Sequence, residues 1–423
     1  MSGFHEKNNA LYAEDVALSD IAAEYGTPTY VYSRAVITTQ YEKLAGAMAK
    51  AMPKSRQPLL CYACKANSNI AVLNLLQKLG SGLEVVSEGE MRRGLKAGFD
   101  ANKIVSTGVG KQDSEIAFGL KEGIHQFNVE SIPEIYHIQK IASELNIVAK
   151  IVFRLNPDVS GGGHHKISTG RKRDKFGISI ERVAEGFNIA KEMSHVEAVG
   201  LSMHIGSQVF NVQSFREAFE KLPNIVHDLR AAGHKVERLD IGGGFPIIYN
   251  DEQLLDLDAY AQWVNEIIVP LETEIIMEPG RYMVGNSGVL LSKSIHIKET
   301  QDRSFVVLDA AMNDLIRPTL YEAYHGIEPV ENRQRTHKLY DIVGPVCETG
   351  DTFATDRSMA EMQAGELAVI KSAGAYGFCM SSNYNTRPLP AEVMVDGDMV
   401  SLIRPRQSYE DIFGGDIVPD FLK

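Results

Sequence analysis

Lys65 ends an apolar run in the stretch Leu59-Leu60-Cys61-Tyr62-Ala63-Cys64-Lys65-Ala66-Asn67. The run is typical of a buried strand, and burying an ammonium at its end costs several kcal/mol. Such a lysine either reaches water or a carboxylate, or loses its proton and acts as a nucleophile. Taken alone, a lysine at the end of a strand is more often a snorkelling side chain. The interpretation of Lys65 as a nucleophile therefore needs support from other parts of the chain.

Polar residues and glycines mark other apolar runs in the same way. Glu84 lies within the run 83–86, and Arg154 lies near the end of the run 151–155. The others stand at the ends of the runs 201–205, 239–241 and 275–277: His204 and Ser207, Gly242-Gly243-Gly244, and Glu278-Pro279-Gly280-Arg281. Consecutive glycines leave backbone N–H groups free to approach an anion, although a triglycine alone is a weak signal. The chain lacks the GK[ST] ending of a Walker A loop here. A phosphate is the anion that this pattern favours.

A phosphate site facing a lone lysine fits pyridoxal phosphate, whose aldehyde forms a Schiff base with lysine. That cofactor needs a carboxylate at its ring nitrogen, for which Glu278 is the candidate, and a group against its ring face, for which His204 is suitable. The simpler alternatives are a salt bridge between Glu278 and Arg281 and a core histidine at position 204.

These residues can form one site only if the strands that carry them lie in a parallel sheet, with their carboxyl ends at the same edge. Eight short strand-like runs alternate with helix-period segments, and this count favours closure into a (β/α)8 barrel over an open doubly wound sheet. The predicted strands are 60–64, 83–86, 103–106, 126–129, 151–155, 201–205, 239–241 and 275–277. The predicted helices are 34–52, 70–79, 88–97, 113–122, 132–145, 180–193, 215–232 and 254–269. In this fold the carboxyl ends of the strands build the active site.

After residue 280 the helical periods become rare and strand patterns follow one another. The predicted strands are 289–297, 304–309, 338–347, 367–372 and 393–403. The chain is therefore predicted to be an α/β protein with a second, C-terminal β-rich domain that also takes in the N-terminal segment. The expected boundaries are 27–284 for the barrel and 1–26 with 285–423 for the β-rich domain.

Composition narrows the classes of function. The 423 residues are 44% hydrophobic and 23% charged, with a net charge of −12, which argues against nucleic acids and anionic membranes as partners. The N-terminus has no signal-peptide pattern, and four cysteines suit a reducing cytoplasm. The loop Ser160–His165 is either a lid or a solvated segment, and its paired histidines lack a spaced carboxylate, so no metal site is expected.

Motifs along the chain resemble those of a known family. Cys64-Lys65-Ala66-Asn67, His204-Ile205-Gly206-Ser207, Gly242-Gly243-Gly244-Phe245 and Glu278-Pro279-Gly280-Arg281 are similar to the alanine-racemase-like (fold type III) pyridoxal phosphate decarboxylases. The segments 309–318, 344–351, 374–377 and 381–385 resemble the diaminopimelate decarboxylase family within that group. The resemblance covers about 30–395 in the family's order. Ala311 departs from it, because the family usually has glycine there.

The resemblance implies roles for single residues. Lys65 would carry the cofactor and Cys347 would return a proton to the substrate carbon, with His204 against the ring. The expected cofactor-binding residues are Lys65, Glu84, Arg154, His204, Ser207, Gly242, Gly243, Gly244, Glu278, Gly280, Arg281 and Tyr376. The expected substrate-binding residues are Arg281, Arg317, Tyr321, Glu348 and Tyr376.

The implied reaction is the decarboxylation of meso-2,6-diaminopimelate to L-lysine and CO2, the last step of lysine biosynthesis. Guanidinium groups suit the distal carboxylate of this substrate, and Glu348 suits its distal ammonium. The resemblance also implies a homodimer with shared active sites, in which Cys347 and Glu348 complete the site of the opposite subunit. The main alternative is a decarboxylase for ornithine, arginine or carboxynorspermidine. A racemase, a non-catalytic cofactor carrier and a cofactor-free barrel enzyme are further alternatives.

Overall fold

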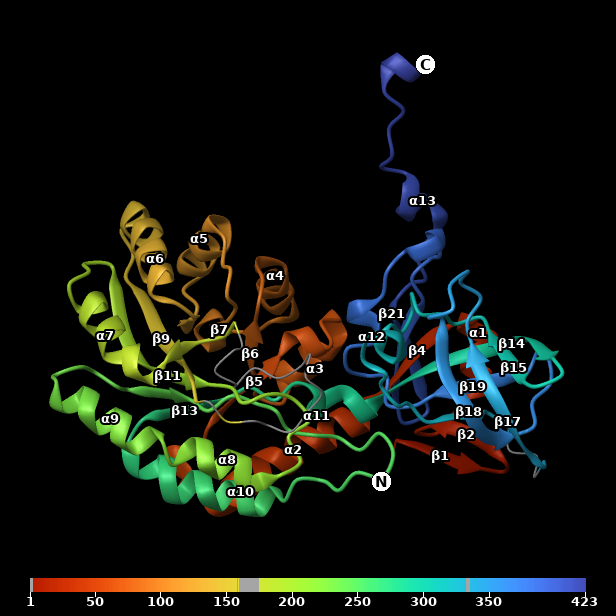
Figure 1. Ribbon diagram of the computed structural model, residues 1–423, viewed down its shortest axis with the longest axis horizontal. Coiled ribbons are helices and arrows are strands. Elements are labelled where there is room, and N and C mark those ends of the chain that lie inside the picture. The colour runs from red at the N-terminus through yellow and green to blue at the C-terminus, as the bar shows by residue number, and fades with distance from the viewer. Residues whose placement is uncertain (1–2, 158, 160–174, 332–334) are drawn as a thin grey trace. The chain divides into compact units, whose positions relative to one another are not determined.

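The computed structural model describes residues 3–157, 159, 175–331 and 335–423 (Figure 1). The chain forms two compact units. The barrel unit comprises Thr38–Ile248 and Glu252–Met283, and the β-rich unit comprises Met1–Ile37, Tyr249–Asp251 and Val284–Lys423. Most of the predicted loop Ser160–His165 and its neighbours up to residue 174 lies outside the described residues.

The barrel unit is built on a closed parallel sheet, which confirms the predicted fold. Pairing of β8 with β9 and of β13 with β5 closes the ring. The strands are β5 (Leu59–Ala63), β6 (Gly82–Val85), β7 (Ile104–Ser106), β8 (Gln126–Val129), β9 (Ala149–Asn156), β11 (Val196–Met203), β12 (Arg238–Asp240) and β13 (Glu274–Met277). The short strand β10 (Ile178–Ser179) is added beside β9. Most strand positions are buried, because both faces of a barrel strand are covered.

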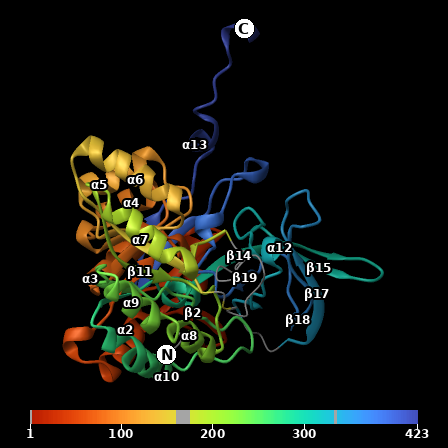
Figure 2. The same cartoon turned by 60° about the vertical axis from the view of Figure 1, so that its left-hand side comes forward.

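Helices surround this sheet on its outer side, as Figures 1 and 2 show for α4 to α7. They are α2 (Arg34–Ala51), α3 (Ile70–Lys78), α4 (Glu88–Ala97), α5 (Asp113–Glu122), α6 (Ile132–Leu145), α7 (Val183–Lys191), α8 (Val212–Phe219), α9 (Leu222–Ala231) and α10 (Leu257–Trp263). The short helix α11 (Arg281–Val284) follows the end of β13. Local signals set several ends: Ser87 caps α4 by accepting from the N–H of Glu90, and Gly98 ends that helix in a left-handed conformation.

The predicted helix 215–232 is divided in the structure into α8 and α9. Pro223 lies in the first turn of α9, a position that favours the start of a new helix. The predicted helix 254–269 is likewise interrupted, since α10 passes into a π-helical turn at Val264–Ile268 and a 3₁₀ turn at Val269–Leu271. Pro270 explains the end, because proline has no N–H for the helical ladder.

The β-rich unit is organised around the long strand β14 (Gly288–Glu299). Its first part pairs with β4 (Thr29–Ser33) and β19 (Leu367–Ile370), and its last part with β15 (Ser304–Leu308). The other strands are β16 (Ile327–Pro329), β17 (His337–Val343), β18 (Thr352–Ala360), β20 (Ala391–Asp396) and β21 (Met399–Arg404), with β1 (Phe4–Lys7), β2 (Ala10–Ala13) and β3 (Val16–Ala17) in a small separate sheet. Short helices α1 (Leu18–Tyr25), α12 (Arg317–Tyr321) and α13 (Tyr409–Phe413) complete the unit.

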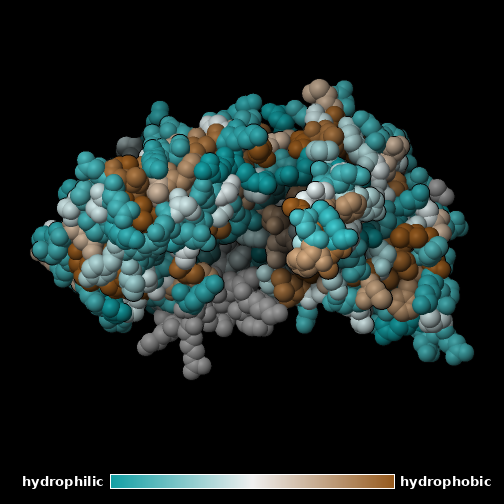
Figure 3. Space-filling view, turned by 90° about the horizontal axis from the view of Figure 1, so that it is seen from above, coloured by the Kyte–Doolittle hydropathy of each residue, from teal (hydrophilic) through white to brown (hydrophobic). Residues whose placement is uncertain are grey.

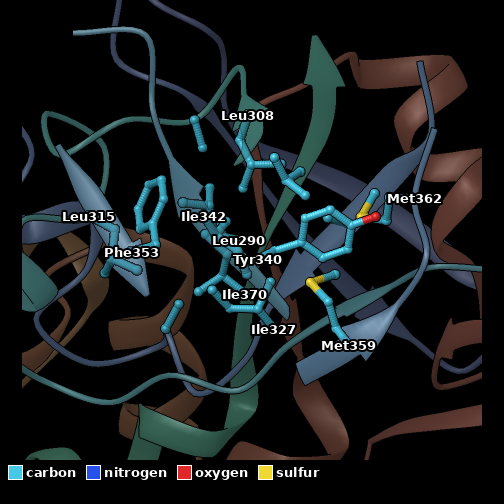
Figure 4. Packing of buried hydrophobic residues seen from close by; sticks show 14 of the residues in the cluster. Leu290, Leu308, Leu315, Ile327, Tyr340, Ile342, Phe353, Met359, Met362 and Ile370 are labelled. Atoms are coloured by element: carbon cyan, nitrogen blue, oxygen red, sulfur yellow. The ribbon is translucent and has the colours of Figure 1, made fainter. Parts of the chain in front are cut away.

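The N-terminal segment belongs to the β-rich unit, as predicted. The expected boundary at residue 27 nevertheless differs from the structure, because β4 lies in this unit between β14 and β20. Two buried tyrosines explain the placement: Tyr30 and Tyr32 pack in a hydrophobic cluster with β-rich residues such as Leu290 and Ile370. Figure 4 shows part of that cluster. The remaining boundaries stay a proposal.

The predicted strand 393–403 is a hairpin, in which β20 and β21 are joined around Gly397 with a φ of +61°. On the face drawn in Figure 3 hydrophilic residues predominate and hydrophobic ones form small groups. Among the described residues, no helix combines the length and apolarity that crossing a membrane requires.

Candidate active site

Lys65 lies directly after β5, in a single 3₁₀ turn at Cys64–Ala66. Its Nζ is 3.1 Å from Oε2 of Glu84, whose side chain is fully buried, while the lysine side chain keeps 38% of its surface exposed. Strand register explains the pair, since Ala63 of β5 is opposite Glu84 of β6. The barrel therefore presents an amine that is held by a buried carboxylate and is still open to a reactant.

A second cluster, at the ends of β12 and β13, contains two carboxyl groups. The side-chain amide of Asn128 donates to both, with Nδ2 2.9 Å from Asp240 Oδ2 and 3.4 Å from Glu278 Oε1. Burial raises the pKa of Glu278 well above its usual range, and the nearby charge of Asp240 adds to the effect. Two buried carboxyl groups that share one amide donor disfavour being ionised together.

Glycine loops lie beside this pair. Gly242 and Gly244 have φ values of +70° and +98°, which favour glycine. A Cβ on Gly243 would lie 2.1 Å from the carbonyl oxygen of Glu278, and one on Gly244 would lie 2.7 Å from that of Gly206. Phe245 fixes the end of the loop, with its ring centroid 4.9 Å from that of Tyr260 in an edge-on arrangement. The backbone is thus held open at a place where no side chain fits.

His204 and Ser207 follow β11 and contact these loops. The N–H of Gly243 donates to His204 Nδ1 at 3.2 Å, so the ring carries its proton on Nε2. Burial lowers the pKa of His204 well below its usual range, and the charges of Arg154 and Lys65 lower it further. Arg281 Nη2 donates to Ser207 Oγ at 3.2 Å. The group is therefore a neutral imidazole next to a hydroxyl and a guanidinium.

Arg154 of β9 lies in a buried network that sequence reasoning missed. Its Nη1 donates to Glu130 Oε1 at 2.7 Å, and the other oxygen of Glu130 accepts from the N–H of Gly177 at 2.8 Å. Glu134 accepts from the N–H of Glu130, and Lys111 donates to Glu134 at 2.7 Å. The cofactor-binding role of Arg154 stays a prediction, and its visible function is to anchor this network.

The other predicted site residues belong to the β-rich unit. Arg317 and Tyr321 begin and end α12, and Tyr376 has a φ of +57° that is unusual for a tyrosine. Cys347 and Glu348 are exposed, so the thiol is not part of a hydrophobic core. The Tyr384 hydroxyl donates to Glu348 Oε2 at 2.8 Å.

The predicted strand 338–347 is too long, because β17 ends at Val343 and a turn carries Cys347. Asp351 holds this turn by accepting from the N–H groups of Val346 at 2.7 Å and Met312 at 2.6 Å. A Cβ on Gly344 would lie 2.4 Å from the Asp351 carboxylate. The turn is therefore fastened by a buried side chain.

Sequence reasoning missed Asp240 and Asn128, which join Glu278 in one polar layer inside the barrel. Asp240 had a usable signal, because an acidic residue stands at the end of a strand two positions before the triglycine. Asn128 lies within an ordinary strand pattern and had none.

The donor set of the barrel suits a phosphorylated aromatic aldehyde. Lys65 supplies an amine for the aldehyde, and Glu278 a carboxyl group for a ring nitrogen. Gly242–Gly244 provide a glycine backbone that a Cβ would block, and Ser207 and Arg281 provide donors for a phosphate. Pyridoxal phosphate has all of these features, so the residues fit the cofactor that the sequence predicted.

Comparison with known proteins agrees with this chemistry. Residues 38–285 match the family described as pyridoxal-dependent decarboxylase, pyridoxal binding domain. Diaminopimelate decarboxylase of Pseudomonas aeruginosa is 44% identical over 416 residues, covering 98% of this chain and 99% of the relative.

Solved structures give the same result. Diaminopimelate decarboxylase from M. jannaschii in co-complex with L-lysine has a TM-score of 0.92 at 35% identity, with 99% of each chain covered. The Helicobacter pylori enzyme complexed with L-lysine has a TM-score of 0.89 at 38% identity, covering 94% of this chain and 98% of that one. This chain belongs to the diaminopimelate decarboxylase family of pyridoxal-dependent decarboxylases.

Proposed function

We propose that the protein decarboxylates meso-2,6-diaminopimelate to L-lysine and CO2, with pyridoxal 5′-phosphate bound in the barrel unit. The observation that carries the proposal is that Lys65 and Glu278 lie at the same end of one closed parallel sheet. Lys65 lies beside the buried Glu84, and Glu278 lies beside the buried Asp240. Family membership supports the substrate, since relatives matched over nearly the whole chain bear this activity in their names.

When bound, the cofactor supplies a conjugated ring that stores the electron pair released as CO2 departs. Lys65 holds it through its amine, and Glu84 keeps that amine in place before the reaction. Glu278 is the carboxyl group that would hold the ring nitrogen, and its negative charge would stabilise positive charge there. The backbone of Gly242–Gly244, Gly280 and Arg281, together with the hydroxyl of Ser207, would hold the phosphate, with Tyr376 as a further ligand.

Cys347 returns the proton to the substrate carbon after CO2 leaves. Its thiol is exposed on a fastened turn, where it can reach a reacting carbon and be reprotonated from water. The described cysteines are all free, and a reducing cytoplasm, which we include in the proposal, keeps such a thiol available.

The intact end of the substrate is recognised by charge. Arg281 and Arg317, with Tyr321, bind the distal carboxylate, and Glu348 binds the distal ammonium. We further propose a homodimer in which Cys347 and Glu348 serve the barrel of the opposite subunit, as the family resemblance implies.

Two measurements test the proposal. Borohydride reduction of the holoenzyme followed by peptide mass spectrometry is expected to find the cofactor mass on the peptide that contains Lys65, and attachment at another lysine would contradict this assignment. A substrate panel then separates the alternatives, with kcat/KM for meso-diaminopimelate expected to exceed that for L-ornithine, L-arginine and carboxynorspermidine by at least about 10³-fold, because their missing distal carboxylate leaves cationic groups unpaired. A preference for any of these three would replace the proposed substrate.

A further inference from the structure

His325 lies fully buried in the β-rich unit between two hydrogen-bonding partners. Its Nε2 is 2.8 Å from Nη1 of Arg317, and its Nδ1 is 2.7 Å from the carbonyl oxygen of Lys371. Arg317 is itself 6% exposed. An imidazole therefore connects the guanidinium at the start of α12 to the backbone that follows β19.

The two contacts fix which imidazole nitrogen carries the proton. A carbonyl oxygen only accepts hydrogen bonds, so Nδ1 must be the donor toward Lys371. A guanidinium only donates, so Nε2 must present a lone pair to Arg317. The neutral imidazole protonated on Nδ1 meets both requirements, whereas a doubly protonated ring would direct an N–H and a positive charge at the guanidinium.

A tyrosine fixes the guanidinium from a second direction. Arg317 Cζ lies 4.6 Å from the ring centroid of Tyr249, and the same ring meets His325 edge-on at 5.4 Å. Tyr249 follows the barrel's glycine loop in sequence, yet Tyr249–Asp251 belongs to the β-rich unit. Arg357 Nη1 donates to the His325 carbonyl oxygen at 2.9 Å, which fastens the backbone of the histidine.

We propose that His325 and Tyr249 are positioning residues that set the orientation of Arg317 and thereby the specificity for a substrate with a distal carboxylate. The inference rests on the proposed function, in which Arg317 binds that carboxylate. A flat guanidinium binds a carboxylate through two parallel hydrogen bonds, so its plane must be set before the substrate arrives. The imidazole fixes one edge of the plane and the tyrosine ring fixes its face, and neither group neutralises its charge.

The test compares two ligands of the holoenzyme by calorimetry. L-lysine keeps the carboxylate that Arg317 is proposed to bind, whereas cadaverine has the same two amines and no carboxylate. For His325→Phe we expect the Kd of L-lysine to rise about 10-fold and that of cadaverine to change less than about 2-fold, because only the first ligand uses the guanidinium. Equal weakening of both ligands, or of neither, would overturn the inference.

His325→Gln is the conservative variant, since its amide oxygen can still accept from Arg317, and we expect it to recover part of the L-lysine affinity. Tyr249 offers a second test, should His325→Phe fail to fold. Tyr249→Ala is expected to weaken L-lysine about 3-fold, whereas Tyr249→Phe, which keeps the ring face, is expected to match wild type. Equal affinities in the two tyrosine variants would contradict the proposed role of the ring.

The outcome is distinguishable from a failure of the proposed function. A wild-type enzyme that releases no L-lysine from meso-diaminopimelate would remove the function itself. Loss of both ligands in His325→Phe, within an enzyme whose wild type releases L-lysine, would remove only the positioning role.

Discussion

The barrel unit and the β-rich unit place their functional side chains by different means. In the barrel, the register of neighbouring strands places the side chains. Lys65 lies beside Glu84 because β5 pairs with β6, and Asp240 lies beside Glu278 because β12 pairs with β13. In the β-rich unit, individual buried side chains hold loops and turns, as Asp351 does for the turn of Cys347. The positions of the barrel side chains therefore depend on the pairing of the whole sheet. The positions of the β-rich side chains depend on hydrogen bonds from single buried residues.

The largest loss of activity is expected from variants that remove one catalytic side chain from either unit. Lys65→Ala and Cys347→Ala should each lower kcat on the order of 10³-fold, because one removes the nucleophile and the other the proton donor. If the units of two copies share a site, an equal mixture of the variants should recover about a quarter of wild-type activity, since half of the dimers are mixed and each has one intact site.

A mixture of Lys65→Ala with the double variant Lys65→Ala, Cys347→Ala is the control, because it restores no site. Cys379→Ala, at the other exposed cysteine, should keep wild-type activity. A mixture of the single variants as inactive as this control, in protein shown to exchange subunits, would mean that the two units of one chain form the site.

A smaller effect is expected from the packing of the barrel loops. Gly243→Ala places a Cβ 2.1 Å from the backbone of Glu278, whereas Gly110→Ala meets no heavy atom within 4 Å. We expect the first variant to lower the free energy of unfolding by about 2–3 kcal/mol and the second to leave it nearly unchanged. Urea unfolding followed by circular dichroism measures the free energy of unfolding of both variants. Equal values would show that the glycine loop shifts to accept a Cβ at little cost, which contradicts the expectation.

Much of the barrel was predictable because its signals are local. Helices α4, α5 and α6 begin and end where the pattern placed them, at residues such as Ser87 and Gly98 that cap or end a helix. Strand β18 was missed, because its sequence Thr-Phe-Ala-Thr-Asp-Arg-Ser-Met-Ala alternates poorly and only Phe353 and Met359 are buried. Its pairing with β17 compensates for the weak pattern.

The candidate site divides in the same way. Residues at strand ends, such as Lys65 and Glu278, were predictable from an abrupt change of residue type. Asn128 and His325 were not, because their roles depend on partners far away in sequence or on a backbone carbonyl, and neither leaves a periodic pattern. The N–H of Gly177 reaches Glu130 across 47 positions, which no local reading detects.

The smallest effect concerns pH and one carboxyl group in each unit. Burial raises the pKa of Glu90 in the barrel unit from 4.5 to about 7 and that of Asp314 in the β-rich unit from 3.8 to about 7. A carboxyl group with a raised folded-state pKa contributes stability that is fully present below its unfolded-state pKa and is lost as the pH rises through about 7.

Glu90→Gln should therefore flatten the fall in stability between pH 4.5 and 7, by roughly 1–2 kcal/mol over that window. Asp314→Asn should act in the same direction in the β-rich unit. Chemical unfolding at several pH values checks both, and an unchanged slope in either variant would show that its carboxyl group is already ionised in the folded protein.

The most direct test of the central claim is the product stoichiometry of the purified holoenzyme supplied with meso-2,6-diaminopimelate. Wild-type protein is expected to release CO2 and L-lysine in equal amounts, while Lys65→Ala releases neither above background and Lys50→Ala, at an exposed lysine, behaves as wild type. Release of CO2 from another amino acid, with none from meso-diaminopimelate, would contradict the assignment of the substrate. Undiminished release by Lys65→Ala would contradict the assignment of the site.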